Sequence, residues 1–136
     1  MQEKTTPSFV QILIIAVILG MVARSVGPVF IRASSDRMVC SLIDRLEAMR
    51  IALDLYRAYH GGGLPPCESF GNFETAMTTK AGRYRPRLNR IPVNPFNGLN
   101  TVRFDGESAG SGRAGWRLDT KSGCFQADSD TGHAGL

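Results

Sequence analysis

The sequence predicts an α+β fold: a long N-terminal membrane-spanning helix that continues into an amphipathic helix packed on a small antiparallel C-terminal sheet. Three observations lead to this prediction. Residues 9–23 contain no charged side chain. Residues 36–59 place apolar side chains three and four positions apart, as one face of a helix requires. Residues 101–128 contain three short strand-like segments separated by polar, glycine-rich turns.

The apolar run follows a short polar leader, residues 1–8, and we expect it to form a membrane stem. Residues 9–23 alone would cover about 22 Å of helix, which is less than the ~30 Å hydrocarbon core of a bilayer. Continuing to residue 31 gives the needed length, with Arg24 as the one charge to be paired or drawn to the interface. We therefore predict a transmembrane helix over residues 9–31, bent or loosened at Gly27-Pro28.

A second interpretation of the same run is a cleaved secretory signal, with Lys4 as its charged start and Ala23 as the small residue at the cleavage site. Met21 stands where such a site needs another small residue. This favours a retained stem, and a mature chain that starts near Arg24 is the alternative.

Residues 32–60 are predicted as an amphipathic helix that continues the stem. The three glycines at 61–63 and the two prolines at 65–66 end it. Its charged side chains fall largely outside one apolar stripe, which we expect to pack against the sheet. The stripe consists of Val39, Leu42, Ile43, Leu46, Met49, Leu53 and Tyr56.

Residues 61–128 are predicted to form a loop region followed by the sheet. A short helix is expected within residues 70–79. The last two strands form a hairpin around the polar loop 120–123, and the tail, residues 129–136, is expected to fray. The strands are expected at residues 101–104, 115–119 and 124–128.

The order of these segments resembles the type IV pilins, and most of all the pseudopilins of type II secretion. The resemblance covers roughly residues 7–128. It implies a non-enzymatic structural subunit in the bacterial inner membrane, crossing it once, with the C-terminal domain outside the cytoplasm. Such a subunit stacks through its stem helix with other pilin-like subunits and works with the secretion machinery. The segments that carry the resemblance are residues 9–20, Pro28, Phe30, residues 33–36, 53–57, 91–96 and 115–119.

Two stem positions depart from the pattern of that family. The resemblance places the peptidase site, where the family has Gly before Phe or Met, at Thr6 and Pro7. A peptide bond that precedes proline is a poor substrate for most proteases. The family's glutamate in the first turn of the stem corresponds to Gln11, which forms hydrogen bonds but carries no charge. Gln11 therefore fits an unprocessed chain, and it is the residue we assign to stem assembly.

No group of residues in the sequence indicates an enzyme. Ser108 lies in a G-x-S-x-G pattern, but a Gly/Ser-rich loop follows it where a nucleophile elbow needs a helix. Residues 110–115 match G-x-G-x-x-G, but they lead into a strand. His60 and His133 have no ligand-type neighbours at metal spacing. We therefore expect no catalytic residue and no metal site.

Partners and cofactors follow from the charges and from the resemblance. The net charge is +4, but the arginines look scattered and most have acidic neighbours, so we do not expect nucleic-acid binding. Major pseudopilins bind calcium in their last loop, and this chain offers four acidic residues in the matching region. The family's loop pattern is not clearly present, so the expectation is a solvated acidic loop and no cofactor. The four acids are Asp105, Glu107, Asp128 and Asp130.

The three cysteines allow two states. A domain outside the cytoplasm permits oxidation, and a Cys67–Cys124 disulfide would tie the loop region to the last strand. Chain entropy gives such a bridge about 4 kcal/mol of stabilisation, and Cys40 would stay reduced. The alternative is three free thiols. A further functional alternative is a secreted or single-pass anchored binding domain that is not part of a filament.

Overall fold

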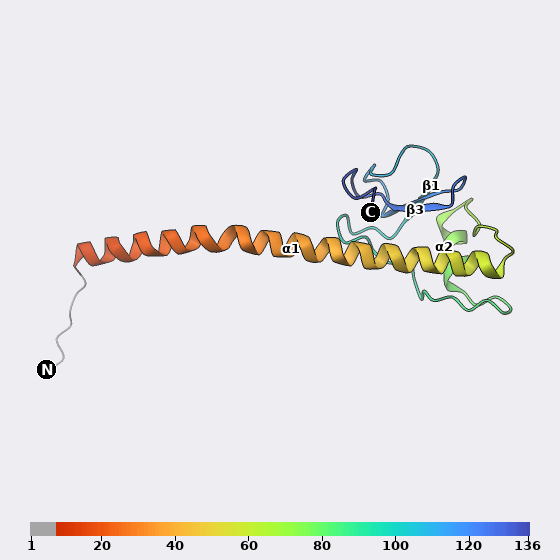
Figure 1. The fold of residues 1–136 in the computed structure, drawn as a ribbon, viewed down its shortest axis with the longest axis horizontal. Coiled ribbons are helices and arrows are strands. Elements are labelled where there is room, and N and C mark those ends of the chain that lie inside the picture. Colours follow the sequence, from red (N-terminus) through yellow and green to blue (C-terminus); the bar gives the residue numbers. More distant parts are fainter. Residues whose placement is uncertain (1–7) are drawn as a thin grey trace. The chain divides into compact units, whose positions relative to one another are not determined.

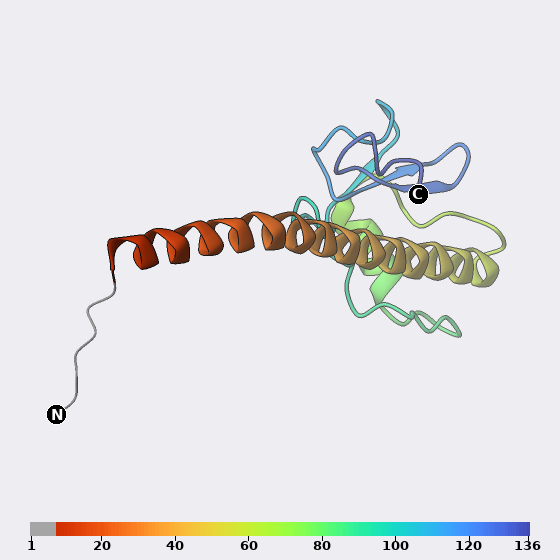
Figure 2. The same ribbon diagram turned by 60° about the vertical axis from the view of Figure 1, so that its left-hand side comes forward.

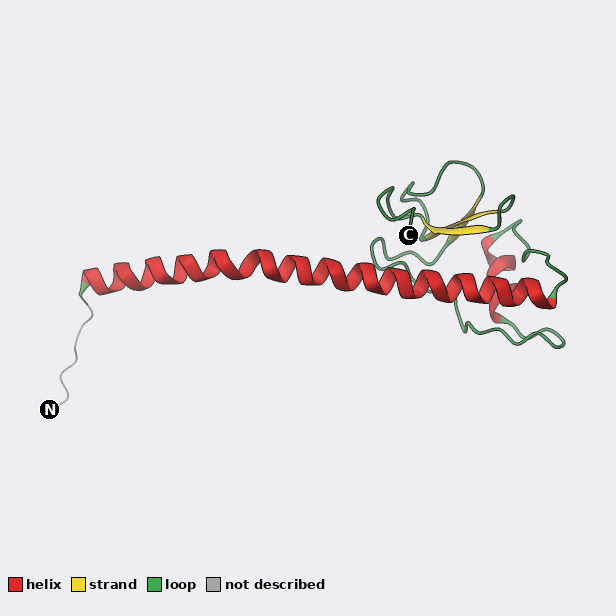
Figure 3. Ribbon diagram, in the orientation of Figure 1, coloured by secondary structure: helices red, strands yellow, loops and turns green. Residues whose placement is uncertain are grey.

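The structure, a computed structural model, describes residues 8–136, leaving aside the side chains at position 20 and at positions 22–33. The predicted α+β class is confirmed (Figures 1 and 3). The chain divides into two compact units, Met1–Arg37 and Met38–Leu136, and the first helix runs from one into the other. The elements are α1 (Phe9–Tyr59), α2 (Phe70–Thr78), β1 (Val102–Phe104), β2 (Trp116–Asp119) and β3 (Cys124–Ala127).

The first helix, α1, has 51 residues and is assigned without a break at Gly27 and Pro28. Its first turn is closed by Ser8, whose carbonyl oxygen accepts hydrogen bonds from the backbone N–H groups of Gln11 and Ile12. The backbone N–H of Ser8 in turn donates to Oε1 of Gln11 at 3.0 Å. This is the N3 half of a capping box, in which a glutamine three residues into the helix satisfies the cap residue. The predicted processing residues Thr6 and Pro7 lie outside the described residues.

In the first unit, residues 9–19 of α1 carry large apolar side chains at nearly every position. Each is more than half exposed, and consecutive positions leave no polar face on this stretch of helix. No helix among the described residues is both long enough and apolar enough to cross a membrane. The exposed side chains are Phe9, Val10, Ile12, Leu13, Ile14, Ile15, Val17, Ile18 and Leu19.

In the second unit, the predicted stripe of α1 forms one side of a single core. Its members at 42, 46, 49, 53 and 56 are buried, as predicted. Ile43 was placed in the stripe wrongly: it lies 100° round the helix from Leu42 and is 42% exposed. The rest of the core comes from α2, from the loops and from the sheet. These residues are Phe73, Met77, Tyr84, Ile91, Val102, Trp116, Leu118, Phe125 and Ala127.

The second helix, α2, matches the short helix expected within residues 70–79. The hydroxyl of Ser69 accepts a hydrogen bond from the backbone N–H of Asn72 at 3.2 Å, which caps the helix. Phe73 and Met77, one turn apart, are its buried residues. This helix therefore adds one apolar face to the core.

The sheet has the order β1-β2-β3, and only half of its predicted pairing is confirmed. Strands β2 and β3 form the expected antiparallel hairpin, with Trp116 opposite Ala127. The wholly antiparallel sheet was wrong, because β1 and β2 are parallel, with Val102 opposite Trp116. Parallel neighbours need a crossover of roughly a dozen residues. The chain from 105 to 115 supplies it, so its anchoring decides the topology.

Candidate functional site

The crossover loop is organised around the guanidinium group of Arg103 on β1. Its Nε and Nη2 atoms donate to the two carboxylate oxygens of Asp128, at 3.2 and 2.9 Å. Its Nη1 atom donates to the carbonyl oxygens of Asp105 and Glu107, at 2.8 and 2.9 Å. Nη2 also donates to the carbonyl oxygen of Ser108 at 3.1 Å. One side chain therefore fixes both the start of the crossover and the residue that follows β3.

Asp128 is the other centre of this network. Its side chain is 0% exposed, and it also accepts hydrogen bonds from the backbone N–H groups of Gly110 and Ser111 and from the Ser111 hydroxyl. Burial raises the pKa of the Asp128 carboxyl. The hydrogen bonds from Arg103, Ser111 and Gly110 outweigh that effect, so the pKa lies below its usual range. Asp128 therefore stays ionised at neutral pH and holds the loop.

Each of the four acidic residues considered as calcium ligands has its own hydrogen-bond or ion-pair partner. Asp105 accepts hydrogen bonds from the backbone N–H and the hydroxyl of Thr120, at 2.7 and 2.6 Å, which lower its pKa. Glu107 lies 3.7 Å from Arg113, and Asp130 pairs with a histidine. Asp128 faces the Arg103 guanidinium, which fills the place between carboxylate and carbonyl oxygens that a cation would take. Over the residues that the structure describes, no cluster of metal-ligating side chains is found.

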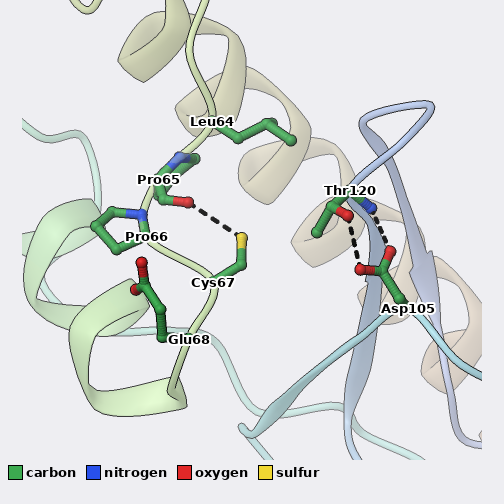
Figure 4. Close-up of a pocket in the computed structure, with 7 residues that line it drawn as sticks. All are labelled: Leu64, Pro65, Pro66, Cys67, Glu68, Asp105 and Thr120. Atoms are coloured by element: carbon green, nitrogen blue, oxygen red, sulfur yellow. Dashed lines mark hydrogen bonds between the residues drawn. The ribbon is translucent and has the colours of Figure 1, made fainter.

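A shallow hollow of about 460 Å³ lies beside the crossover loop (Figure 4). Its cysteine, Cys67, donates from Sγ to the carbonyl oxygen of Pro65 at 3.0 Å. Burial, and then the nearby charges of Asp105 and Glu68, raise the pKa of the Cys67 thiol. A raised pKa disfavours the thiolate, so this hollow has no activated nucleophile. The lining residues are Leu64, Pro65, Pro66, Cys67, Glu68, Asp105 and Thr120.

The Cys67–Cys124 disulfide is absent from the structure, in which Cys40, Cys67 and Cys124 are all free. Alternation along β3 explains the difference. Phe125 and Ala127 point into the core, so Cys124 points to the opposite face of the sheet and is exposed. Cys67 instead packs against the core cluster. The two thiols therefore project into different surroundings.

Alkylation should distinguish the three thiols in the native protein. Cys40 and Cys124 are exposed and should react rapidly with iodoacetamide at pH 8. Cys67 should react more slowly, because it is half-buried and its pKa is raised. Mass spectrometry of peptides quenched over time measures the three rates. A linked Cys67–Cys124 peptide under non-reducing conditions would restore the disulfide interpretation.

The other candidate residues from the sequence, Ser108, His60 and His133, do not form a common site. Ser108 is exposed, and no histidine or carboxylate hydrogen-bonds to its hydroxyl within the described residues. The Nδ1 atom of His60 donates to the Tyr56 carbonyl oxygen, 2.8 Å away, and the His60 ring stacks on the Tyr56 ring. His133 pairs with Asp130 at 2.6 Å. The sequence analysis did not identify the Arg103 network. Its signals in the sequence are an arginine within an apolar strand, Arg103, and an aspartate directly after the last strand, Asp128.

Comparison with family models, with curated proteins and with solved structures finds no match for this chain. A proposal for its function therefore rests on its own residues and on the resemblance described above.

Proposed function

We propose that the chain is a non-enzymatic structural subunit resembling a pseudopilin. It is anchored through residues 9–31, crosses the bacterial inner membrane once and keeps its C-terminal domain outside the cytoplasm. It assembles through its stem helix with other pilin-like subunits, in a type II secretion or type IV pilus-like system. The observation that carries this proposal is the exposed apolar surface of α1 from Phe9 to Leu19.

Apolar side chains on that surface are unfavourable in contact with water, so we expect another apolar surface to cover them. Nine large apolar side chains are each more than half exposed there, and they surround the helix. Burying one such side chain contributes about 1.5–3 kcal/mol, so covering all nine contributes on the order of 10 kcal/mol or more. Lipid and neighbouring stems both supply an apolar cover. Exposed apolar surface of this extent on a lone helix is typical of membrane or partner contact.

The polar side chain of the stem supports lateral assembly. Oε1 of Gln11 accepts from the Ser8 backbone N–H, so the amide oxygen is used within the chain. Its Nε2 atom has no hydrogen-bond acceptor among the described residues. An amide donor surrounded by lipid lacks an acceptor, whereas a neighbouring stem offers one.

Membrane extraction tests the anchor. The full chain should stay in the pellet after carbonate treatment, and a form lacking residues 1–31 should be released. Mass spectrometry of the extracted protein gives its first residue: Met1 for an unprocessed anchor, Pro7 for a processed pilin. A start near Arg24 together with recovery in the wash would overturn the proposal and favour the alternative, a secreted binding domain outside any filament.

Two substitutions of Gln11 separate helix capping from assembly. Gln11→Glu keeps an oxygen acceptor for Ser8 but removes the Nε2 donor, and Gln11→Leu removes both. If Nε2 joins stems, both variants should weaken lateral association by roughly 0.6–2 kcal/mol. Insertion should survive in Gln11→Leu, which makes the span more apolar.

Cysteine crosslinking between stems measures this association. Single cysteines placed at Ile12 to Ile18, one per variant, are introduced after Cys40, Cys67 and Cys124 have been replaced by serine. Stem packing predicts crosslinks that recur with the helical period, and their yield should fall in both Gln11 variants. Equal yields in wild type and both variants would remove Gln11 from assembly. No crosslink at any position would favour an anchor without a filament.

A further inference from the structure

The residues between 80 and 90 form an unusually basic segment. In this basic segment, five of eleven residues are cationic, and no Asp or Glu occurs from 75 to 104. The chain has a net charge of +4, so removing these five charges would make it −1. The positive charge of the whole protein is therefore concentrated here. The five residues are Lys80, Arg83, Arg85, Arg87 and Arg90.

These cations differ from the other arginines of the second unit in having no partner. All five are exposed, and none forms a hydrogen bond or ion pair with the described residues. The six other arginines of the unit each have at least one such contact. Those six are Arg45, Arg50, Arg57, Arg103, Arg113 and Arg117. The earlier expectation of scattered, locally neutralised arginines thus fails for the basic segment.

The core fixes the direction in which the basic segment presents its charges. Tyr84 is 1% exposed, and Leu88 packs against the core cluster. Arg85 and Arg87 alternate with these inward residues and are exposed. Arg83 lies in the turn closed by hydrogen bonds between Ala81 and Tyr84, and Arg90 lies in a bend. The segment therefore presents a cluster of exposed cations to solvent.

Contacts at both ends hold the basic segment alongside α1. The Tyr84 ring lies edge-on to the rings of Tyr56 and His60, at centroid distances of 5.3 and 5.5 Å. Further on, Arg45 of α1 donates to the carbonyl oxygen of Val93. The segment thus follows α1 over about three turns, on the side away from the sheet (Figures 1 and 2).

The basic segment ends at a hollow with two guanidinium groups. Arg45 and Arg90 line this hollow of about 480 Å³, together with Pro92 and Val93. The bond to Val93 holds Arg45 at its rim. The ring of Tyr59 is 54% exposed and lies 6.0 Å from the ring of Tyr84, which belongs to the basic segment. A flat aromatic surface therefore stands beside the charges.

We propose that the basic segment binds single-stranded nucleic acid through its phosphates, without sequence preference. Arginine suits phosphate because its planar fork donates two parallel hydrogen bonds. A cluster of exposed cations fits a polymer that carries many phosphates, and an exposed ring near it offers a stacking surface for a base. The five exposed cations and the exposed Tyr59 ring supply both features here.

The same residues fit other anionic partners less well. From 80 to 92 no large apolar side chain is exposed, and Val93 beside them is only 38% exposed, so this stretch offers little apolar surface to insert between lipids. A stable protein interface has an apolar centre inside its polar rim, and residues 80–92 provide none. A polymer held mainly by charge requires neither of these features.

Fluorescence anisotropy tests the proposal on the full chain in phosphatidylcholine nanodiscs. The probe is a labelled oligothymidylate of about 20 nucleotides, longer than most single-strand binding sites. With five phosphate contacts, the affinity should fall roughly 100-fold between 50 and 200 mM salt. The triple variant Arg83→Gln, Arg85→Gln, Arg87→Gln should lower the slope of log affinity against log salt by about 2.

A matched variant controls for net charge. Arg37→Gln, Arg113→Gln, Lys121→Gln removes the same charge from exposed residues outside the basic segment and should keep wild-type binding. Tyr59→Leu should weaken binding about fivefold or more, since stacking on a ring is lost. Fluorescence of the single tryptophan, the buried Trp116, checks that each variant is folded.

Each of the following outcomes would overturn the proposal. Equal losses in the two triple variants would mean that net charge alone matters. Equal competition by polyglutamate would mean that the surface takes any polyanion. Binding to phosphatidylglycerol vesicles but not to the oligonucleotide would assign the segment to a membrane surface. No binding at 50 mM salt and 100 μM protein, where non-specific binding is normally measurable, would exclude nucleic acid.

Discussion

Replacing Asp128 with alanine is expected to destabilise the second unit by about 3–5 kcal/mol, because it removes one partner of a buried ion pair and leaves the other charge unpaired. The Arg103 guanidinium, whose side chain is 19% exposed, would lose the carboxylate that receives two of its hydrogen bonds. The backbone N–H groups of Gly110 and Ser111 would also lose their acceptor. For a unit of this size, the melting temperature should fall by about 15 °C or more.

Thermal unfolding followed by tryptophan fluorescence measures this effect. Trp116 is the single tryptophan, is buried, and donates from Nε1 to the Pro92 carbonyl oxygen at 2.7 Å, so it reports on the second unit. Asp44→Ala is the control, since Asp44 is exposed and forms no salt bridge with any residue that the structure describes. The control should change stability by no more than about 0.5 kcal/mol. A shift below about 3 °C for Asp128→Ala would show that the network does not hold the fold.

The same network makes the free energy of unfolding depend on pH. The folded pKa of Asp128 is lower than its unfolded value, near 3.9. A lowered pKa gives stability that is fully present above the unfolded value and is lost as the pH falls through the folded value. Wild-type protein should therefore weaken below about pH 4. Asp128→Asn, which cannot ionise, should start less stable and show a flatter profile in that range.

Local sequence patterns predicted the elements of this fold well. The periodicity of α1 located five of its buried residues, and the turn at 120–123 located the hairpin. Such patterns depend on neighbours in the chain, so they are visible without the structure. The same patterns wrongly placed Ile43 in the buried stripe and Cys124 in a disulfide with Cys67. They do not show how wide the buried stripe of α1 is, or which face of β3 packs against the core.

The direction of β1 and the centre of the site could not be predicted in this way. Strand direction depends on where the crossover loop returns, and Arg103 and Asp128, 25 residues apart, fix that return. No periodicity records a contact between such distant residues. The basic segment was different, since its density of arginine was visible in the sequence. What only the structure added was that these cations form no hydrogen bond or ion pair with the residues it describes.

Leu46→Ala and Leu53→Ala are each expected to destabilise the second unit by about 2–5 kcal/mol. The two side chains are 1% and 2% exposed, on the face of α1 that meets the core. Each substitution removes buried apolar surface and leaves a cavity that close-packed neighbours fill only in part. Alanine favours the helix at least as well as leucine, so a loss cannot come from helix propensity.

Ile43→Ala and Ile51→Ala supply matched controls on the same helix. Their side chains are 42% and 41% exposed, so truncation removes little buried surface, and alanine has the higher helix propensity. Melting followed by Trp116 fluorescence should therefore separate two groups. The core variants should melt about 10 °C or more below wild type, and the controls should melt near it. If all four variants shift alike, α1 does not meet the core through the face described. If the controls lose stability only when the protein is assembled, Ile43 and Ile51 lie in a contact between subunits.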